Sequence, residues 1–214
     1  MMELKPVIII GAEGLGTVAL DIFESNNTTV YCFLDDNEKL HNTEIGEVSV
    51  LGSPEDDGFL KYIGHKCDAF VAVEDISDRK SYVDLLKNRR KVMPANALHP
   101  SALISTKASL GHGNLIAAKV VVSTGAEIGH HCLIHANSLI DYNAKVADFV
   151  QIGAGSIINA GVEIAEGAFI GSGVTIVSGV KIGSNARIGA GSVVIKSVEN
   201  NQTVFGNPAV AMDN

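Results

Sequence analysis

A glycine-rich turn near the start of the chain is the first segment whose residues could do chemistry. The turn Gly11-Ala-Glu-Gly-Leu-Gly16 follows an apolar, β-branched run over residues 4–10 and precedes a helical pattern that ends near Glu24. Such a turn can present backbone N–H groups and a helix N-terminus to a phosphate, although G-x-x-G-x-G differs from the dinucleotide-binding G-x-G-x-x-G. Glu13 would repel a phosphate, so the alternative is a turn with a purely structural role. Asp35-Asp36 ends the next expected strand, where carboxylates accept hydrogen bonds from a ribose or a base.

Four histidines in the second half of the chain form the other candidate set. His112 and His130 are 18 residues apart, which is one coil of the solenoid inferred below, while His131 and His135 share the stretch HHCLIHAN. A metal site needs several converging ligands. The His130–His135 spacing resembles the paired ligands of γ-class carbonic anhydrases, but Pro94 stands where that family has a further histidine. We therefore expect no metal and a solvated column for His112 and His130, and a general-base role stays open.

The elements that position these residues follow from a period of six. Aliphatic residues recur at every sixth position from Leu98 to Val194 without exception. This period fits neither a helix nor a strand, and it is typical of a hexapeptide β-helix. The position two residues earlier is small or β-branched from Ala102 to Ser192, except at Asn114, and alternating large and small residues let coils pack without voids. We expect between five and six three-sided coils of about 18 residues each.

The first part of the chain alternates strands and helices instead. Strands are expected over residues 4–10, 30–34, 48–51 and 68–73, and helices after the glycine turn, from about Ser53, and over 78–90. This alternation predicts a small parallel α/β sheet. The expected domains are a Rossmann-like domain over residues 1–93 and the solenoid over residues 94–214.

Charge and composition exclude several classes of partner. The chain has 214 residues and a net charge of −8, and residues 1–96 carry 10 Lys and Arg against 17 Asp and Glu. An acidic chain without basic runs argues against nucleic acid or an anionic membrane as partner. No segment reaches the length of a membrane span. The start, MMELKPVIII, lacks a basic n-region and a cleavage site, so we expect no signal sequence. Cys32, Cys67 and Cys132 are expected to be buried thiols, so we expect a cytoplasmic protein.

The two halves together resemble a known family. The resemblance is to bacterial sugar acetyltransferases of the sialic acid O-acetyltransferase group. It is carried by four segments: GAxGxG at the turn, FLDD after it, NxLHPSALIS at the start of the solenoid and GNPA at its end. The layout is most similar to UDP-4-amino-sugar N-acetyltransferases, which make bacillosamine-type sugars. The resemblance implies a left-handed parallel β-helix, a homotrimer, and acetyl-CoA bound between the solenoids of neighbouring subunits. It also implies a UDP-sugar-like substrate, with the nucleotide in the N-terminal domain at Gly11, Ala12, Glu13, Gly14, Asp35 and Asp36.

Several positions depart from the pattern of that family. Its turn has Ser and His where this chain has Glu13 and Leu15, and its later G-N pair aligns with Val73-Glu74-Asp75. Its catalytic Glu-His-Glu/Asp aligns with Asp141-Tyr142-Asn143, and its second histidine with Gln151. A neutral tyrosine is a poor base at pH 7, although it can donate a hydrogen bond to a thioester oxygen or a leaving thiolate. Asp141 or His135 could replace the base.

The acyl-donor side keeps more of the pattern. Small residues at Ala160, Gly161, Ser172 and Gly173 are compatible with CoA, with Gln151 near the thioester. Lys181, Arg187 and Lys196 could contact CoA phosphates or form a solvated face. We expect an acetyl-CoA-dependent acetyltransferase that acts on a nucleotide-linked amino sugar or a related sugar, with an atypical active site. The alternative is a degenerate member that binds nucleotide-sugar or CoA without turnover.

Overall fold

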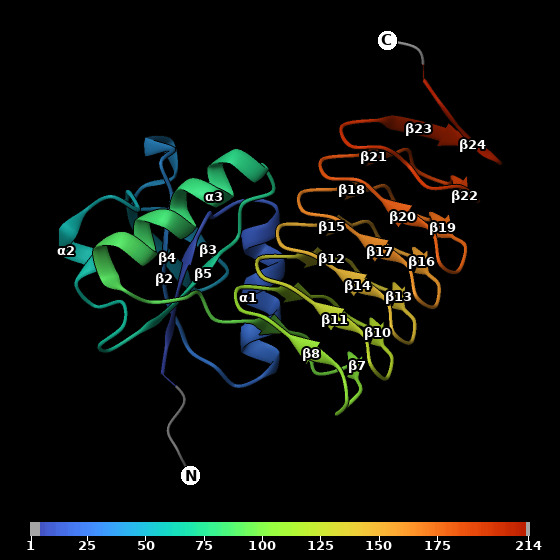
Figure 1. The fold of residues 1–214 in the computed structure, drawn as a ribbon. Coiled ribbons are helices and arrows are strands. Elements are labelled where there is room, and N and C mark those ends of the chain that lie inside the picture. Colours follow the sequence, from blue (N-terminus) through green and yellow to red (C-terminus); the bar gives the residue numbers. More distant parts are fainter. Residues whose placement is uncertain (1–4, 213–214) are drawn as a thin grey trace. The chain divides into compact units, whose positions relative to one another are not determined.

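The computed structural model describes residues 5–212 of the chain (Figure 1). The chain divides into two compact units, of which the first ends at Pro100 and the second begins at Ser101. The expected boundary between residues 93 and 94 precedes this division, and the assignment of residues 94–100 to the solenoid domain stays a prediction. Residue 4, the expected start of the first strand, lies outside the described residues.

A five-stranded sheet forms the centre of the first unit. Its order is β3-β4-β2-β1-β5, and its strands are β1 (Val7–Ile10), β2 (Val30–Leu34), β3 (Glu44–Ile45), β4 (Val48–Gly52) and β5 (Asp68–Val71). Neighbouring strands are parallel except for the antiparallel pair β3 and β4. All four residues of β1 are buried, as is typical of a parallel strand that is covered on both faces. The expected parallel α/β sheet is confirmed, although β5 ends at Val71 rather than Val73.

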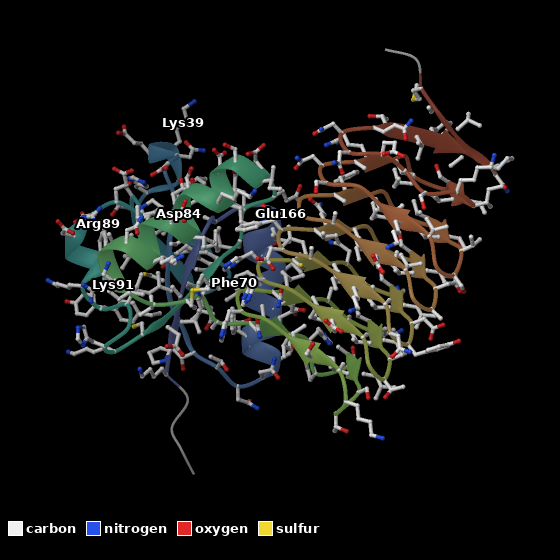
Figure 2. All side chains as sticks on the ribbon, viewed as in Figure 1. Lys39, Phe70, Asp84, Arg89, Lys91 and Glu166 are labelled. Carbon is white, nitrogen blue, oxygen red and sulfur yellow. The ribbon has the colours of Figure 1, made fainter. Side chains whose placement is uncertain are left out.

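Helical segments lie between these strands and after the last of them. They are α1 (Leu15–Ser25), η1 (Glu38–Leu40), α2 (Asp57–Leu60), α3 (Ile76–Leu85) and η2 (Leu86–Arg90). α3 begins where the carboxylate of Asp75 accepts hydrogen bonds from the backbone N–H groups of Ser77 and Asp78, which is a side-chain cap. Phe23 of α1 packs edge-on against Phe70 of β5, which Figure 2 labels. This contact fixes α1, and therefore the glycine turn before it, against the sheet.

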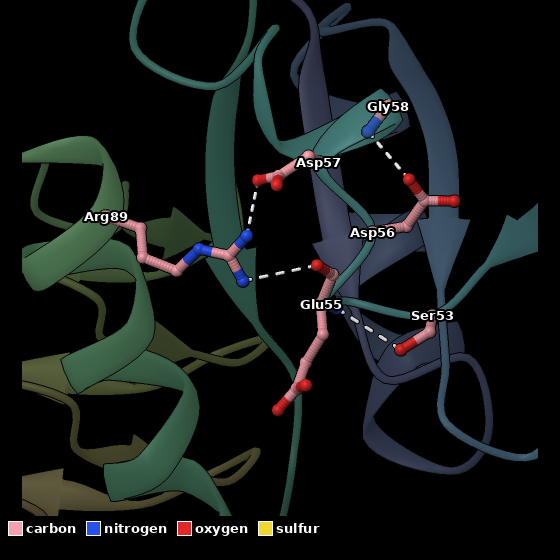
Figure 3. Close-up of polar contacts among 6 residues, drawn as sticks. All are labelled: Ser53, Glu55, Asp56, Asp57, Gly58 and Arg89. Atoms are coloured by element: carbon pink, nitrogen blue, oxygen red, sulfur yellow. Dashed lines mark hydrogen bonds and ion pairs between the residues drawn. The ribbon is translucent and has the colours of Figure 1, made fainter.

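The segment before α2 is a turn (Figure 3). The hydroxyl of Ser53 accepts a hydrogen bond from the N–H of Glu55 at 3.2 Å, and Asp56 caps α2 by accepting from a backbone N–H at 2.6 Å. Arg89 of η2 donates to the carbonyl of Glu55 at 3.2 Å and contacts the carboxylate of Asp57. The expectation that a helix starts at Ser53 is wrong, because Ser53 bonds the backbone two residues on and so forms a turn.

Three parallel sheets form the three faces of the second unit. The first face consists of β7 (Leu103–Ile104), β10 (Val121–Val122), β13 (Leu139–Ile140), β16 (Ile157–Ile158), β19 (Thr175–Ile176) and β22 (Val193–Val194). The second face consists of β8 (Ser109–Leu110), β11 (Glu127–Ile128), β14 (Lys145–Val146), β17 (Glu163–Ile164) and β20 (Lys181–Ile182). The third face includes β9 (Leu115–Ile116), β12 (Leu133–Ile134), β15 (Gln151–Ile152), β18 (Phe169–Ile170), β21 (Arg187–Ile188) and β23 (Thr203–Gly206). β6 (Ala97–Leu98) precedes them in the first unit.

Turns between these faces form three corners. The first corner joins the first face to the second (residues 105–108, 123–126, 141–144, 159–162 and 177–180). The second corner joins the second face to the third (residues 111–114, 129–132, 147–150, 165–168 and 183–186), and the third corner returns to the first face (residues 117–120, 135–138, 153–156, 171–174 and 189–192). In the first corner one position takes left-handed backbone in four of the five segments, as Gly125, Gly161 and Gly179 and as Asn143 with a φ of 55°. Asparagine tolerates this conformation better than most residues.

The period-six residues form the core of the second unit. From Ile116 to Val194 all of them are buried, with exposed fractions of 3% or less. Ile104 and Leu110 are half-buried, because they belong to the first coil of this unit. Asn114, the exception to the small-residue pattern, is fully buried, donates to the carbonyl of Gly129 at 2.9 Å and accepts from the N–H of Cys132 at 2.7 Å. The predicted hexapeptide register is confirmed.

The chain ends in a hairpin. β23 pairs antiparallel with β24 (Ala209–Ala211), and the peptide bond between Asn207 and Pro208, inside the GNPA segment, is cis. All three cysteines lie within the described residues, where they are buried and form no disulfide. Within residues 5–212, no helix is both long enough and apolar enough to cross a membrane.

Candidate active site

The glycine turn leads from β1 into α1 with very little room around it. A side chain at Gly16 would place its Cβ 2.2 Å from the carbonyl oxygen of Gly11, and a Cβ at Gly11 would lie 2.5 Å from the carbonyl oxygen of Ala72. Gly11 also has a φ of 99°, a conformation that favours glycine. The backbone of the turn therefore packs directly against the end of β5.

A cavity of about 330 Å³ lies at this turn. Its lining combines the ends of three neighbouring strands: Gly11, Ala12, Glu13, Gly14, Leu15, Asp35, Ala72, Val73 and Glu74. β1 lies between β2 and β5, so the chain order reverses beside it. Ligands bind open α/β sheets at such a switch point, beyond the carboxyl ends of the strands. The structure thus brings together five of the six expected nucleotide-binding residues.

The carboxylate of Asp35 is held in place at the edge of the cavity by two backbone N–H groups. Its Oδ2 accepts a hydrogen bond from the N–H of Ala12 and its Oδ1 accepts one from the N–H of Asn37, both at 2.8 Å. Glu13 and Glu74 also line the cavity, whereas none of the described lining residues is Lys or Arg. The negative charge around this cavity is unfavourable for a bare phosphate.

Asp36 is the expected residue that does not line this cavity. Its Oδ1 accepts from the hydroxyl of Ser53 at 2.8 Å, and its Oδ2 accepts from the hydroxyl of Tyr82. Burial of the phenol, followed by the hydrogen bond to Asp36, raises the pKa of Tyr82 well above its usual range. The carboxylate of Asp36 therefore ties β2 to α3.

Arg79 is a residue that sequence reasoning missed. Its side chain is only 1% exposed, and its Nη1 donates to the carbonyls of Val73 at 2.7 Å and Glu74 at 2.9 Å. It therefore holds the wall of the cavity that follows β5. No pattern in the sequence distinguishes it from the other cationic residues of α3 and η2.

The residues aligned with the catalytic motif lie at the first corner. Tyr142 is 52% exposed, and its backbone N–H donates to Oδ1 of Asp141 at 2.7 Å. Asn143 follows in left-handed backbone, and Gly161 donates its N–H to the carbonyl of Tyr142 at 3.1 Å. A cavity of about 470 Å³ lies beside them, lined by Leu103, Ser105, Val121, Val122, Ser123, Thr124, Asp141 and Tyr142. The structure thus joins a phenol, a carboxylate and several hydroxyls.

His135 lies at the third corner instead, together with Ser172 and Gly173. The Nε2 of His135 is 3.5 Å from the Nε2 of Gln151 on the third face. Both side chains are half-buried. Ala160 and Gly161 share the first corner with Tyr142, so the small residues expected to bind the cofactor divide between two corners of a single chain.

Lys181 lies on the second face, away from both groups. Its Nζ pairs with Glu163 at 2.9 Å, and Lys145 pairs with Glu127 at 3.4 Å. These two pairs line a shallow groove of about 700 Å³ along this face. Contact with a CoA phosphate would require Lys181 to leave its carboxylate partner.

The histidine column lies at the second corner. The Nδ1 of His130 accepts from the backbone N–H of His112 at 3.0 Å, and Asp148 accepts from the N–H of His130 at 2.8 Å. The rings of His112 and His130 stack. Among the described residues, no three His, Cys, Asp or Glu side chains gather in a way that could hold a metal ion. The column caps the backbone of successive coils.

Family models match both halves of the chain. Residues 6–86 match the PglD N-terminal domain, and residues 131–166 and 162–196 match the bacterial transferase hexapeptide of six repeats. No curated protein matches the chain in sequence.

Solved structures are similar over nearly the whole chain. A mutant of GDP-perosamine N-acetyl transferase from Caulobacter crescentus, in complex with CoA and GDP-perosamine, is 26% identical with a TM-score of 0.88, and 99% of each chain is covered. The acetyltransferase domain of PglB from Neisseria gonorrhoeae, in complex with acetyl coenzyme A, is 23% identical with a TM-score of 0.89, covering 98% of this chain and 100% of that one. WeeI from Acinetobacter baumannii is 24% identical with a TM-score of 0.86, covering 97% and 99%.

These matches confirm the expected architecture, a Rossmann-like N-terminal domain followed by a left-handed parallel β-helix. The N-terminal model covers every residue that lines the cavity at the glycine turn, and the hexapeptide model covers the coils that carry Tyr142 and His135. The chain therefore combines a PglD N-terminal domain with the hexapeptide repeats of bacterial transferases.

Proposed function

We propose that this protein is an acetyl-CoA-dependent acetyltransferase that acts on a nucleotide-linked amino sugar or a related sugar. The observation that carries the proposal is similarity over 99% of both chains to a GDP-perosamine N-acetyl transferase whose structure contains CoA and GDP-perosamine. Both units contribute to this similarity, so it covers the cavity at the glycine turn as well as the solenoid.

In this proposal each group of residues has a distinct role. The cavity at Gly11, Glu13 and Asp35 takes the nucleotide end of the acceptor, with the backbone of the turn as its hydrogen-bonding surface. The hydroxyl of Tyr142 donates a hydrogen bond to the thioester oxygen, where negative charge develops as the amine attacks. Asp141 and Asn143 hold the Tyr142 corner in shape.

The remaining candidates bind the acyl donor. The pantetheine arm of acetyl-CoA lies against small residues, which leave room for it. These are Ala160 and Gly161 at the first corner and Ser172 and Gly173 at the third. Gln151 lies near the thioester, and Lys181 binds a CoA phosphate as a point charge.

A cytoplasmic homotrimer is part of the proposal. The outward column of the first face is apolar except at Thr175: Leu103, Val121, Leu139, Ile157, Thr175 and Val193. Leu103 is 68% exposed and Ile157 39% exposed. An apolar sheet face of this kind favours association with further copies.

Release of free CoA thiol tests the proposal. Acetyl-CoA is incubated with the protein and a panel of UDP- and GDP-linked amino sugars, and the thiol is measured against a blank without acceptor. We expect turnover with at least one acceptor and none with the same sugar already N-acetylated. Absence of turnover with the whole panel contradicts the proposal.

A second candidate function follows from the residues at the first corner. Tyr142 and Asn143 occupy the positions at which the family resemblance places a histidine and an acid. A degenerate homologue would bind CoA or nucleotide-sugar without turnover. Calorimetric binding of both ligands, combined with no thiol release, would favour this candidate.

A further inference from the structure

Arg79 is the only Lys, Arg, Asp or Glu side chain that is buried within residues 5–212. It lies in α3, the helix that follows β5 (Figure 1), and its backbone N–H donates to the carbonyl of Asp75 at 2.9 Å. Side chains on a helix lean toward its N-terminus, so Arg79 reaches back to Val73 and Glu74. A buried charge destabilises a protein unless its hydrogen-bonding groups find partners. For Arg79 these partners include the wall of the cavity at the glycine turn.

The two hydrogen bonds of Arg79 also orient the peptide groups of this wall. In a planar trans peptide the C=O and the following N–H point in opposite directions, and the peptides of this wall are not cis. The carbonyls of Val73 and Glu74 point toward Arg79, so the N–H groups of Glu74 and Asp75 point away from it. Among the described residues, neither N–H group has a hydrogen-bond acceptor. Arg79 therefore leaves two donors on the opposite side of the wall.

The glycine turn offers N–H groups of the same kind. α1 begins at Leu15, and the N–H groups of Glu13, Gly14 and Leu15 find no acceptor within residues 5–212. The first N–H groups of a helix lack partners inside it, and successive N–H groups in a loop can bind an anion. These three residues line the same cavity as Val73 and Glu74. An anion in this cavity can therefore accept from two loops, one of which is held by Arg79.

The acidic side chains of the cavity oppose an anion only weakly. Glu13 and Glu74 are exposed, so water and salt screen their carboxylates. The carboxylate of Asp35 already accepts two backbone N–H groups. Arg79 is buried and does not line the cavity, and a buried charge is screened much less than an exposed one. The guanidinium behind the wall therefore offsets the acidic rim where an anion approaches the backbone.

We propose that Arg79 is a positioning residue for the diphosphate of a nucleotide-linked acceptor. Arg79 fixes the wall at Val73 and Glu74, and the N–H groups of that wall bind the phosphate oxygens. Arg79 itself stays buried and does not touch the ligand. This inference rests on the nucleotide role of the cavity in the proposed function. Because the diphosphate is common to UDP- and GDP-linked sugars, the same wall serves either base.

Calorimetric titration with UDP, GDP and CoA tests this assignment. Arg79→Met keeps an unbranched apolar stem of similar reach but removes every donor. We expect its Kd to rise by about 10–100-fold for whichever of UDP and GDP binds the unaltered protein more tightly, because hydrogen bonds to a charged phosphate are lost. The Kd for CoA should not change. Arg79→Lys keeps the charge without the planar fork, so its loss should be smaller than that of Arg79→Met.

Arg90 supplies the matched control, because it also holds backbone carbonyls of the first unit. Its Nε and Nη2 donate to the carbonyl of Ile63 at 3.1 and 2.9 Å, and its Nη2 donates to that of Lys61 at 3.0 Å. Neither carbonyl belongs to a residue that lines the cavity. Arg90→Met should therefore bind UDP, GDP and CoA like the unaltered protein.

Steady-state kinetics separate positioning from a general loss of structure. With an acceptor that is turned over, Arg79→Met should raise the KM for the acceptor by the same factor as the Kd and leave kcat nearly unchanged, because a saturated cavity holds the acceptor as before. A merely structural role would lower the amount of active protein, which reduces kcat and leaves KM unchanged.

The outcomes distinguish the two proposals. If the unaltered protein binds UDP or GDP but turns over no acceptor, the acetyltransferase function is wrong, and the Kd of Arg79→Met still decides the role of Arg79. If neither nucleotide binds, the nucleotide role of the cavity and the role of Arg79 are both wrong. Unchanged nucleotide binding by Arg79→Met, equal losses of nucleotide and CoA binding, or an equal loss in Arg90→Met would overturn the assignment. If Arg79→Met does not fold, the same measurements on Arg79→Lys decide.

Discussion

Adjacent carboxylates at Asp35 and Asp36 have different partners, although both follow the same strand. Asp35 accepts backbone N–H groups from Ala12 and Asn37 and lines the cavity. Asp36 accepts hydroxyl groups from Ser53 and Tyr82. Asp35 thus belongs to the candidate site, whereas Asp36 has a structural role. The two side chains differ because successive residues at a strand end point in opposite directions.

The contact between Tyr82 and Asp36 predicts a dependence of stability on pH. Since the pKa of Tyr82 is raised in the folded protein, its contribution to stability is fully present below about pH 10, where an unfolded tyrosine ionises, and is lost as pH rises further. Urea unfolding at pH 8 and pH 11 should show a larger fall in unfolding free energy for the unaltered protein than for Tyr82→Phe. Tyr31→Phe, at a half-exposed tyrosine, is the control and should behave like the unaltered protein. Equal falls for the unaltered protein and Tyr82→Phe would contradict the assignment.

The strand-to-helix junction at β1 and α1 is the element on which the nucleotide cavity depends. Gly16 lies inside α1, where alanine normally stabilises a helix by about 1 kcal/mol relative to glycine. At this position, however, the added Cβ would lie 2.2 Å from the carbonyl oxygen of Gly11. The steric clash of the added Cβ with the turn therefore outweighs the higher helix propensity of alanine at this position.

We predict that Gly16→Ala lowers the unfolding free energy by roughly 1–3 kcal/mol, the usual range for overpacking. Val18→Ala at an exposed position of the same helix should change it by less than about 0.5 kcal/mol. Urea unfolding monitored by circular dichroism measures both. A stabilised Gly16→Ala variant would show that the junction has room that the geometry does not indicate.

In the solenoid, the burial of a core residue depends on the position of its coil in the stack. Each coil buries its inward residue against the coils on either side, so a middle coil has two neighbours. Ile152 is fully buried, whereas Ile104 at the first coil of the second unit is half-buried. The same residue type thus has different environments according to its place in the stack.

Truncation of these two residues tests this dependence on position. Ile152→Ala should lower the unfolding free energy by roughly 2–5 kcal/mol, and Ile104→Ala by clearly less, since it removes less buried surface. Chemical denaturation of both variants provides the comparison. Equal losses would mean that the coils do not differ in packing.

Local patterns predicted most of the fold. The expected parallel sheet and the hexapeptide register are both confirmed, because each depends on the periodicity of apolar residues. The helix start at Ser53 was predicted wrongly, because a hydrogen bond from the N–H of Glu55 to the hydroxyl of Ser53 competes there with helix formation. Arg79 could not be found, because its role depends on carbonyls that burial brings to it.

By itself the sequence determined the solenoid, the α/β sheet and the grouping of residues around the glycine turn, since strand ends in a parallel sheet meet at one edge. Only the tertiary structure decided that Asp36 is tied to Tyr82 and that Tyr142 and His135 lie at different corners. Positions seven residues apart in a linear repeat are near in the chain, but a three-sided coil places them on opposite edges of a face. That separation is set by the corners, where the chain changes direction.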